Sequence, residues 1–363
     1  MKVSIGSKIV EGPWGGGNLF AKNLSEFLLD RGHEVVYDLS HEDIDIILLT
    51  DPRSRRESSS TFNHKDIRRY LKYVNPNSVV IQRINECDER KGTKNINTFY
   101  KNASEVADHI VFVSNWLMEI YLSLGLEKEK CSVVLAGANK NIFNTHDRMV
   151  SKNPNVLKFV THHWSDHWNK GFDIYKKLDQ LINKKYSQYK LEFTYIGNLP
   201  NNLILKNTVH IEPLSGADLA AEIKYHDIYI TASINEPSGN HHIEASQCGL
   251  PVLYLDSGGI PEYCEGFGVS FTGLDDFEDG LKKIINNYLS YSKKMETYPF
   301  NSIKMCDEFY ELFERKVAEK SKNSLQNKKN ILKKPVLYST KFFNFLTSRF
   351  NINKLVSVIE KIK

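Results

Sequence analysis

Short apolar runs alternate with amphipathic stretches along the first half of the chain. Between the runs, Leu24, Phe27 and Leu28 follow the i, i+3, i+4 spacing of a helix that ends near Gly32. Strands that are apolar throughout and separated by helices are typical of a parallel sheet covered on both faces. The predicted strands of this half lie at residues 3–5, 34–37, 44–49, 78–81 and 109–113. They predict a doubly wound α/β domain.

The same alternation starts again near residue 157. The second set of predicted strands lies at residues 157–160, 191–196, 209–211, 227–230 and 251–255. The polar segment 144–155 lies between the sets and is predicted to be a linker. We therefore predict two Rossmann-like domains, residues 1–150 and 151–320, with a last helix that crosses back to the first domain. Because ligands bind at the carboxyl ends of such strands, we expect the two sheet edges to face each other across a cleft.

The composition is that of an ordinary globular protein. Of the 363 residues, 41% are hydrophobic and 25% are charged. No run approaches the roughly 20 apolar residues of a membrane-spanning helix, and the first residues enter a strand pattern without the features of a signal peptide. The five cysteines are scattered, which favours free thiols in a reducing compartment. We therefore expect a cytoplasmic protein.

Positive charge is concentrated in the last segment. The whole chain has a net charge of +4, yet residues 321–363 hold ten lysines or arginines and a single acid, Glu360. Apolar residues among them, including Ile352, Leu355 and Ile359, follow helical spacing. This segment is expected either to bind an anionic membrane surface, to pack on the protein itself or to form a dimer contact. The rest of the chain is net negative and has no nucleic-acid-binding motif, so nucleic acid is not an expected partner.

A glycine-rich segment, residues 12–17, follows the first strand. It precedes a helix that we expect to begin near Leu19. Glycines at a strand-to-helix turn allow backbone N–H groups to approach a phosphate, although the same residues also suit a flexible turn. The strict dinucleotide fingerprint fails, because Phe20 occupies its third glycine position. Asp38, after the second strand, leaves a dehydrogenase only as a distant alternative.

Residues 161–173 follow the first strand of the second domain and hold a candidate for phosphate chemistry. Lys170 in this segment is suited to neutralise a diphosphate leaving group, because positive charge is needed where negative charge accumulates. The alternative is a solvated lysine at a helix start. The segment also has three histidines and Asp166, but their spacing matches no zinc motif. We therefore predict no metal site in this segment.

Two glutamates flank a predicted helix start after the strand at 227–230. Glu236 lies in the loop, and Glu244 lies eight residues later, about one turn into the helix. Carboxylates accept hydrogen bonds from sugar and ribose hydroxyls, so the pair is suited to contact two ends of one ligand. The helix macrodipole alone also favours acids near this position. A second glycine loop follows at residues 256–262.

Together these segments resemble the retaining GT-B glycosyltransferases of family 4. The family signature E-P-x-G-x-x-x-x-E-A, followed by G-x-P-V and G-G-x-x-E, is matched in register. The matching residues are Glu236, Gly239, Glu244, Ala245, Gly249, Pro251, Val252, Gly258, Gly259 and Glu262. Residues 134–139 and the pair Lys170-Gly171 extend the similarity over most of residues 1–320. The resemblance implies a transferase that moves a sugar from a UDP- or GDP-sugar and needs no cofactor and no catalytic metal.

The resemblance also implies roles for individual residues. Glu236 would contact the donor sugar and Lys170 the diphosphate, and we expect these two to be the catalytic residues. Glu244 would contact the ribose hydroxyls. The other donor-binding residues that it implies are Gly16, Gly17, Gly239 and Asn240. Retention would follow a front-face route, in which the leaving phosphate helps to deprotonate the acceptor hydroxyl.

Two positions depart from the family pattern. The arginine that the family carries shortly before the pair Lys170-Gly171 is replaced by His162 or His163, and we include both among the donor-binding candidates. The N-domain histidine of the family has no clear counterpart. The corresponding strand end instead offers three residues that we expect on the acceptor side: Arg83, Asn85 and Glu86.

The acceptor and the overall activity are less sharply indicated. The stretch 162–173 resembles polysaccharide-assembly members of the family, which favours a glycan or lipid-linked acceptor and a role in cell-surface polysaccharide assembly. Arg53, Arg55 and Arg56 are expected either to face an anionic acceptor or to lie in a surface loop. A nucleotide-sugar epimerase and a non-catalytic GT-B protein that binds a partner or a glycan are the alternatives. The intact glutamate pair favours the enzyme.

Overall fold

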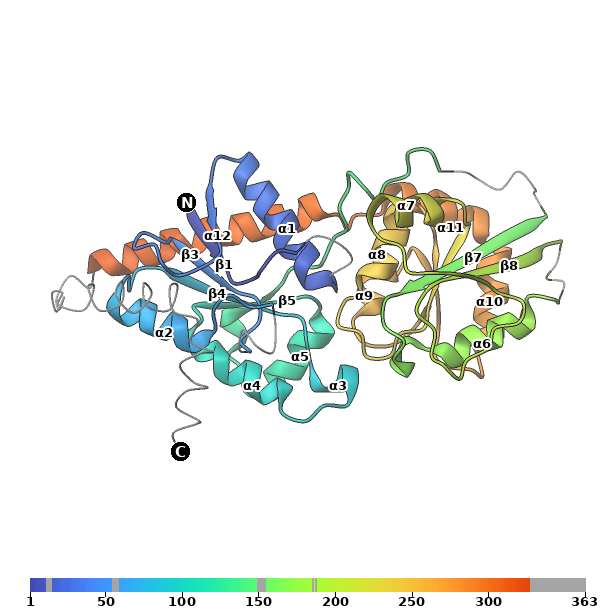
Figure 1. The fold of residues 1–363 in the computed structure, drawn as a ribbon, viewed down its shortest axis with the longest axis horizontal. Helices are drawn as coiled ribbons and strands as arrows, with labels where there is room; N and C mark the ends of the chain where they lie inside the picture. Colours follow the sequence, from blue (N-terminus) through green and yellow to red (C-terminus); the bar gives the residue numbers. More distant parts are fainter. Residues whose placement is uncertain (11–14, 54–58, 149–154, 185, 187, 327–363) are drawn as a thin grey trace, which may run out of the picture.

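The computed structural model describes residues 1–10, 15–53, 59–148, 155–184, 186 and 188–326. It has two lobes, each built around a parallel sheet (Figure 1). We call the lobe with the first sheet the N-domain and the other the C-domain. Most of the predicted basic segment 321–363, from residue 327 onward, lies outside the described residues, and so do Arg55 and Arg56.

The N-domain sheet has six strands in the order β2-β1-β3-β4-β5-β6, all paired in parallel. Its strands are β1 (Lys2–Ile5), β2 (Glu34–Val36), β3 (Ile46–Leu49), β4 (Val79–Ile84), β5 (His109–Phe112) and β6 (Cys131–Val133). Its helices are α1 (Gly15–Asp30), α2 (His64–Tyr73), α3 (Asp88–Lys91), α4 (Ile96–Ala103) and α5 (Asn115–Ser123). The order confirms the predicted doubly wound domain.

The C-domain sheet also has six parallel strands, in the order β12-β11-β10-β7-β8-β9. Its strands are β7 (Val156–His163), β8 (Lys190–Gly197), β9 (Val209–Ile211), β10 (Ile228–Thr231), β11 (Val252–Leu255) and β12 (Gly268–Phe271). The helices that follow them are α6 (Phe172–Leu181), α7 (Gly216–Lys224), α8 (Asn240–Gln247), α9 (Ile260–Cys264), α10 (Phe277–Asn286) and α11 (Tyr288–Lys294). The second predicted Rossmann-like domain is therefore confirmed.

The strands are apolar on both faces because each face packs on its own layer of helices. In β4, Val79 and Ile81 join the core under α1, whereas Val80 joins the core on the opposite face with Ile67 of α2. All four residues are almost fully buried. This alternation of faces within one continuous apolar run is what a doubly covered parallel sheet requires.

The first helix begins earlier than the sequence pattern indicates. We expected a start near Leu19, but α1 begins at Gly15, so that Gly16 and Gly17 lie in its first turn. Glycine has a low helix propensity, which is why the pattern of apolar residues delays the predicted start. Because glycine has no side chain, a residue of the other domain can approach the N-terminal end of α1 closely.

The last helix, α12 (Ser302–Gln326), returns to the N-domain (Figure 1). The chain crosses beside its first passage between the domains, where the amide of Ser302 donates a 2.8 Å hydrogen bond to the carbonyl of Ala138. On α12, the ring of Phe309 lies 5.0 Å from that of Phe20 in α1. Residues of α12 thus complete the core beneath α1.

The two domains also join through α9 of the C-domain. The Tyr263 hydroxyl donates to the carbonyl of Val113 and accepts a 3.0 Å hydrogen bond from the amide of Ala136. The Glu262 carboxylate accepts from the amides of Asn115 and Trp116, both at 2.8 Å, and so caps the N-terminus of α5. These contacts fix one edge of the domain interface. Among the described helices, none is long and apolar enough to cross a lipid bilayer.

Candidate active site

Lys170 is set against the end of β10 by a glycine. It closes a single 3₁₀ turn, Trp168–Lys170, that follows β7. The next residue, Gly171, has a φ of +81°, and a Cβ there would stand 2.2 Å from the carbonyl oxygen of Ala232. Only glycine meets both conditions, so the residue directly after Lys170 has to be glycine. Lys170 itself is only 8% exposed, so its side chain is buried.

Glu236 is held by the second glycine loop. The amide of Gly259 donates a 2.9 Å hydrogen bond to the backbone carbonyl of Glu236. Gly258 has a φ of +66°, and a Cβ there would lie 2.5 Å from the same carbonyl oxygen. The loop therefore packs directly on the backbone of Glu236. Three residues later, Gly239 with a φ of +78° is the N-cap of α8, and a Cβ there would lie 3.0 Å from Cγ of Glu236, so the start of α8 lies beside this side chain.

Two cationic side chains, those of Lys170 and Arg90, pair with the carboxylate of Glu236. Nζ of Lys170 lies 2.6 Å from Oε2 of Glu236, and Nη2 of Arg90 lies 3.1 Å from Oε1. Nη1 of Arg90 reaches Oε2 of Glu86 at 3.2 Å. Burial alone would raise the pKa of Glu236, but the charges of Lys170 and Arg90 outweigh it and lower the pKa to about 2. The carboxylate is therefore ionised throughout the neutral range.

Arg90 is the site residue that sequence reasoning missed. It comes from α3 of the N-domain, four residues after Glu86, yet it contacts the C-domain. Two amide side chains of the C-domain hold α3 in place: Asn169 donates to the carbonyl of Arg90 at 2.7 Å, and Asn235 donates to that of Glu89 at 3.1 Å. Asn169 and Asn235 directly precede Lys170 and Glu236. The two loops that hold α3 through hydrogen bonds therefore also carry the residues of the ion pair.

The segment that carries Arg90 is itself well ordered by hydrogen bonds. The Asp88 carboxylate accepts from the Thr93 hydroxyl at 2.7 Å and from the amides of Ile96 and Asn97 at 2.9 and 3.0 Å. Asp88 thereby caps α4 and closes the loop behind α3. Nε of Arg90 is buried and has no hydrogen-bond partner among the described residues.

The two histidines that replace the family arginine point in different directions. Nε2 of His162 lies 3.0 Å from Oε2 of Glu244. His163, the next residue on β7, instead has its Nε2 2.7 Å from the Tyr175 hydroxyl. Burial lowers the pKa of His163 well below its usual range, so its imidazole is neutral. His163 therefore contributes no cation to the site, whereas His162 lies beside the second glutamate.

The start of α8 is packed with further histidines. His241 bonds the Thr231 hydroxyl at 2.8 Å, and its ring lies 4.7 Å from that of His163. Burial lowers the pKa of His241 well below the usual range and that of His242 to about 3. Both rings are therefore neutral, and the fixed positive charge beside Glu236 comes from Lys170 and Arg90. In the described part of the chain, no three His, Cys, Asp or Glu side chains are arranged to hold a metal ion.

The N-terminal ends of two helices from different domains meet at the site. A Cβ on Gly16 of α1 would lie 3.1 Å from Oδ1 of Asn240, the first residue of α8. A Cβ on Gly17 would meet nothing within 4 Å. Among the residues predicted from the sequence, the structure therefore brings together Gly16 with Asn240, Lys170 with Glu236, and His162 with Glu244.

The three expected acceptor-side residues have different surroundings. Glu86 pairs with Arg90, and Asn85 is half-buried. The guanidinium carbon of Arg83 stacks 4.1 Å above the Phe20 ring, and Arg83 is almost fully buried. Arg83 lies near the carboxyl end of β4, and Asn85 and Glu86 directly follow this strand, so all three belong to the N-domain side of the site.

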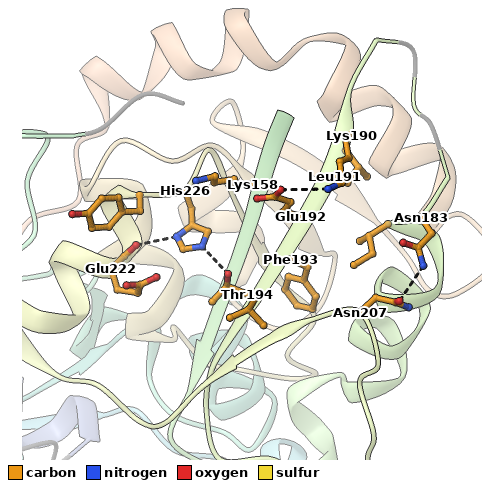
Figure 2. A pocket seen from close by; sticks show the side chains of 13 residues that line it. Lys158, Asn183, Lys190, Leu191, Glu192, Phe193, Thr194, Asn207, Glu222 and His226 are labelled. Carbon is orange, nitrogen blue, oxygen red and sulfur yellow. Dashed lines mark hydrogen bonds and ion pairs between the residues drawn. The ribbon is translucent and has the colours of Figure 1, made fainter. Parts of the chain in front are cut away.

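Two cavities open at opposite ends of the C-domain sheet. One, of about 650 Å³, lies after β7 and β8 and is lined by Trp164, Asn198 and Glu212 among others. It is at the same sheet edge as Lys170. The other, of about 610 Å³, lies around Lys158 and Lys190 near the starts of those strands (Figure 2). The second cavity is therefore remote from the site.

Comparison with known proteins connects this arrangement to a family. The model of the family described as "Glycosyl transferases group 1" matches residues 154–287. This range includes Lys170, Glu236 and Glu244, the C-domain residues of the site.

The curated relatives carry related names. The chain is 24% identical over 249 residues to the phosphatidylinositol N-acetylglucosaminyltransferase gpi3 subunit of Schizosaccharomyces pombe. The matched region covers 65% of this chain and 53% of that protein. It is 28% identical over 193 residues to an uncharacterized glycosyltransferase of Haemophilus influenzae, which covers 49% of this chain and 54% of that protein. The chain thus spans about half the length of the curated relatives that it matches.

Solved structures share the whole two-domain fold. A glycosyltransferase from Rickettsia africae superposes with a TM-score of 0.62 at 14% identity, over 87% of this chain and 98% of that one. HepE of Anabaena, in complex with UDP-glucose, superposes with a TM-score of 0.60 at 15% identity, over 87% and 100%. Residues 154–287 are therefore a domain of the group 1 glycosyl transferases, in a chain that has the GT-B fold and resembles family 4 of these enzymes.

Proposed function

We propose that this protein is a retaining glycosyltransferase that moves a sugar from a nucleotide-sugar donor to a hydroxyl of a glycan or lipid-linked acceptor. The observation that carries the proposal is the pairing of Glu236 with Lys170 at 2.6 Å and with Arg90 at 3.1 Å, beside the N-terminus of α8. Such a site combines an acceptor for sugar hydroxyls with cations for a diphosphate.

The donor side of the proposal rests on the C-domain. Lys170 would contact the diphosphate, Glu236 the transferred sugar and Glu244 the ribose. The first amides of α8, at Gly239 and Asn240, would receive the phosphate oxygens, because a helix N-terminus favours anions. HepE, a structural neighbour, was solved with UDP-glucose, which supports a UDP-sugar as the first donor to test. A GDP-sugar is the second.

The chemistry is proposed to need no metal ion. As the bond between the sugar C1 and the phosphate oxygen breaks, negative charge grows on the diphosphate, and Lys170 and Arg90 would stabilise it. The acceptor oxygen would form its bond to C1 on the same face, and its proton would pass to the leaving phosphate. Arg90 would thus replace, from the other domain, the arginine that the family signature carries near Lys170.

The acceptor is proposed from weaker support. The two curated relatives described above are both named as glycosyltransferases, and only one of the names refers to an acceptor, so the names agree on sugar transfer alone. A glycan or lipid-linked acceptor follows from the resemblance of residues 162–173 to polysaccharide-assembly enzymes. The basic segment 321–363 is proposed to bring the enzyme to an anionic membrane surface on the cytoplasmic side.

Thermal unfolding with a ligand panel tests the donor proposal. UDP, GDP, ADP and their glucose and N-acetylglucosamine conjugates are added at millimolar concentration to the native protein and to Glu244→Ala. We expect one nucleotide to raise the Tm, by an amount equivalent to about 2.7 kcal/mol at 100 Kd, and Glu244→Ala to lose most of that response. Glu192→Ala, a substitution of a partly exposed glutamate on β8, serves as the matched control.

Two further measurements test the mechanism. NMR of the product should show the anomeric configuration of the donor, and EDTA should leave the initial rate unchanged. An inverted product would reject the retaining mechanism, and loss of activity in EDTA that Mg²⁺ or Mn²⁺ restores would reject metal independence. If no nucleotide in the panel shifts the Tm of the native protein, the transferase proposal itself fails.

A further inference from the structure

Arg83 is a buried arginine that has no carboxylate partner among the described residues. It lies near the carboxyl end of β4 and is only 5% exposed. Over the ranges that the structure describes, no carboxylate forms an ion pair with its guanidinium and no acceptor takes a hydrogen bond from it. Its guanidinium carbon lies 4.1 Å from the centroid of the Phe20 ring.

Two other arginines of the N-domain, in contrast, have carboxylate partners. Arg53, after β3, is paired with Asp51 at 2.6 Å, and Arg90 shares Glu86 and Glu236. The ionisable groups that act on Arg83 are the hydroxyls of Tyr100 and Tyr263, and burial raises the pKa of both, so they are neutral. Within the described part of the chain, no negative charge therefore compensates that of Arg83.

An uncompensated buried charge is costly, because it has lost its hydration without gaining a counter-ion. Burial lowers the pKa of Arg83 to about 10, which still leaves the guanidinium charged at neutral pH. The contact with Phe20 offsets only part of that cost. A site that keeps such a charge is suited to receive an oxyanion, which a guanidinium binds through two parallel hydrogen bonds.

The position of Arg83 indicates which substrate would supply the oxyanion. The proposed donor residues Lys170, Glu236 and Glu244 belong to the C-domain, where Lys170 and the start of α8 already serve a diphosphate. Arg83 belongs to the N-domain sheet, on the side of β4 that faces α1, as Val111 beside it on β5 does. The second substrate is the one expected there.

We propose that Arg83 binds an oxyanion of the acceptor, so that the acceptor carries a phosphate or carboxylate group. This inference rests on the proposed transferase function. It narrows the acceptor from any glycan or lipid-linked hydroxyl to an anionic one. Arg83 is a binding and specificity residue in this account, and it takes no part in bond breaking.

The test begins with stability, because a structural role gives the opposite result. Arg83→Met keeps an aliphatic stem on Phe20 and removes the charge, and Arg83→Lys keeps the charge. If the charge serves a ligand, the Tm of Arg83→Met is equal to or higher than that of the native protein. A fall of several degrees in Arg83→Met that Arg83→Lys largely restores would show a structural charge and overturn the proposal. Arg68→Met, where the native side chain is 59% exposed, is the control.

The second arm measures acceptor preference with matched hexosides that are neutral, 6-phosphorylated or oxidised to the uronic acid. The native enzyme should have a KM at least about 10-fold lower for one anionic form than for the neutral one. Arg83→Met should lose this ratio and Arg83→Lys should regain part of it. Equal KM values for all three hexosides in the native enzyme would overturn the proposal.

The third arm separates donor from acceptor through the Tm shift that the nucleotide produces. A shift that persists in Arg83→Met assigns the oxyanion to the acceptor, whereas its loss assigns Arg83 to the donor diphosphate and overturns the proposal. If the native protein shows no nucleotide shift, the transferase function fails and the proposal falls with it. A normal native shift with no anion preference overturns only the inference about the acceptor.

Discussion

Nη2 of Arg90 lies 3.1 Å from Oε1 of Glu236, although the two residues belong to different domains. Their neighbours strengthen the link, since Asn169 and Asn235 of the C-domain donate hydrogen bonds to carbonyls of α3. One of the two cations beside Glu236 therefore depends on how the domains sit together. A GT-B enzyme can in this way couple domain closure to the assembly of its charged site.

Replacing Arg90 should impair transfer more than an ordinary surface arginine does. We expect Arg90→Ala to lower kcat/KM by about 10- to 100-fold, because the charge-assisted contact that we propose between Arg90 and the diphosphate would be lost. Arg90→Lys should recover little, since a lysine cannot reach Glu86 and Glu236 together. Steady-state kinetics with the donor identified by thermal shift provide the measurement. Arg69→Ala, at a side chain that is 71% exposed, is the control, and a change within twofold for Arg90→Ala would contradict the assignment.

Glu236→Gln should have an effect on stability that depends on pH. The pKa of Glu236 is lowered from its usual 4.5 to about 2, so the carboxylate contributes stability that is complete above pH 4.5 and disappears as the pH falls toward 2. At pH 7 we expect the free energy of unfolding of Glu236→Gln to be lower by an amount on the order of 3 kcal/mol. Urea unfolding of both proteins at several pH values measures this difference. A difference that stays constant from pH 7 to pH 3 would argue against the ion pairs.

His226 should make the C-domain sensitive to mild acid. Its ring lies between the Thr194 hydroxyl and the carbonyl of Glu222, each at 2.9 Å (Figure 2), and burial lowers its pKa to about 4. The unfolded chain binds a proton near pH 6.5 and the folded one only near 4, so stability is complete above 6.5 and falls between these values. In His226→Gln, the loss of unfolding free energy between pH 6.5 and 4 should be smaller by about 3 kcal/mol. His146→Gln, at an exposed position, should leave the slope unchanged.

Two glycines allow the loop behind Glu236 to be tested against a matched control. Gly258 and Gly266 both have positive φ, +66° and +84°, but a Cβ on Gly258 would strike the Glu236 carbonyl at 2.5 Å, whereas one on Gly266 would meet nothing within 4 Å. Gly266→Ala should cost only the backbone strain, about 1 kcal/mol of unfolding free energy, and keep kcat. Gly258→Ala should cost more and also lower kcat, because Glu236 must move. Equal effects of the two substitutions would show that the contact with Glu236 is unimportant.

The fold was largely predictable from the sequence because each buried strand is a continuous apolar run. Lys170 and Glu236 were also predictable, since each stands at a fixed distance from a glycine that the loop geometry requires. Arg90 was not, because its contact with Glu236 arises from the packing of two domains, which hydrophobic periodicity does not describe. His162 and His163 cannot both face the donor, because successive residues of a strand point to opposite sides; His162 contacts Glu244, whereas His163 contacts Tyr175.

The return of α12 has a consequence for how the chain acquires its structure during synthesis. The core beneath α1 includes Met305, Phe309 and Phe313, which are among the last described residues to be translated. The first sheet therefore leaves the ribosome with the core beneath α1 incomplete, whereas the hydrophobic cores of the second domain use no described residue later than Phe300. We expect the second domain to mature first and the first domain to wait for α12, so that a ribosome stalled before residue 305 would carry an open, protease-sensitive N-terminal half.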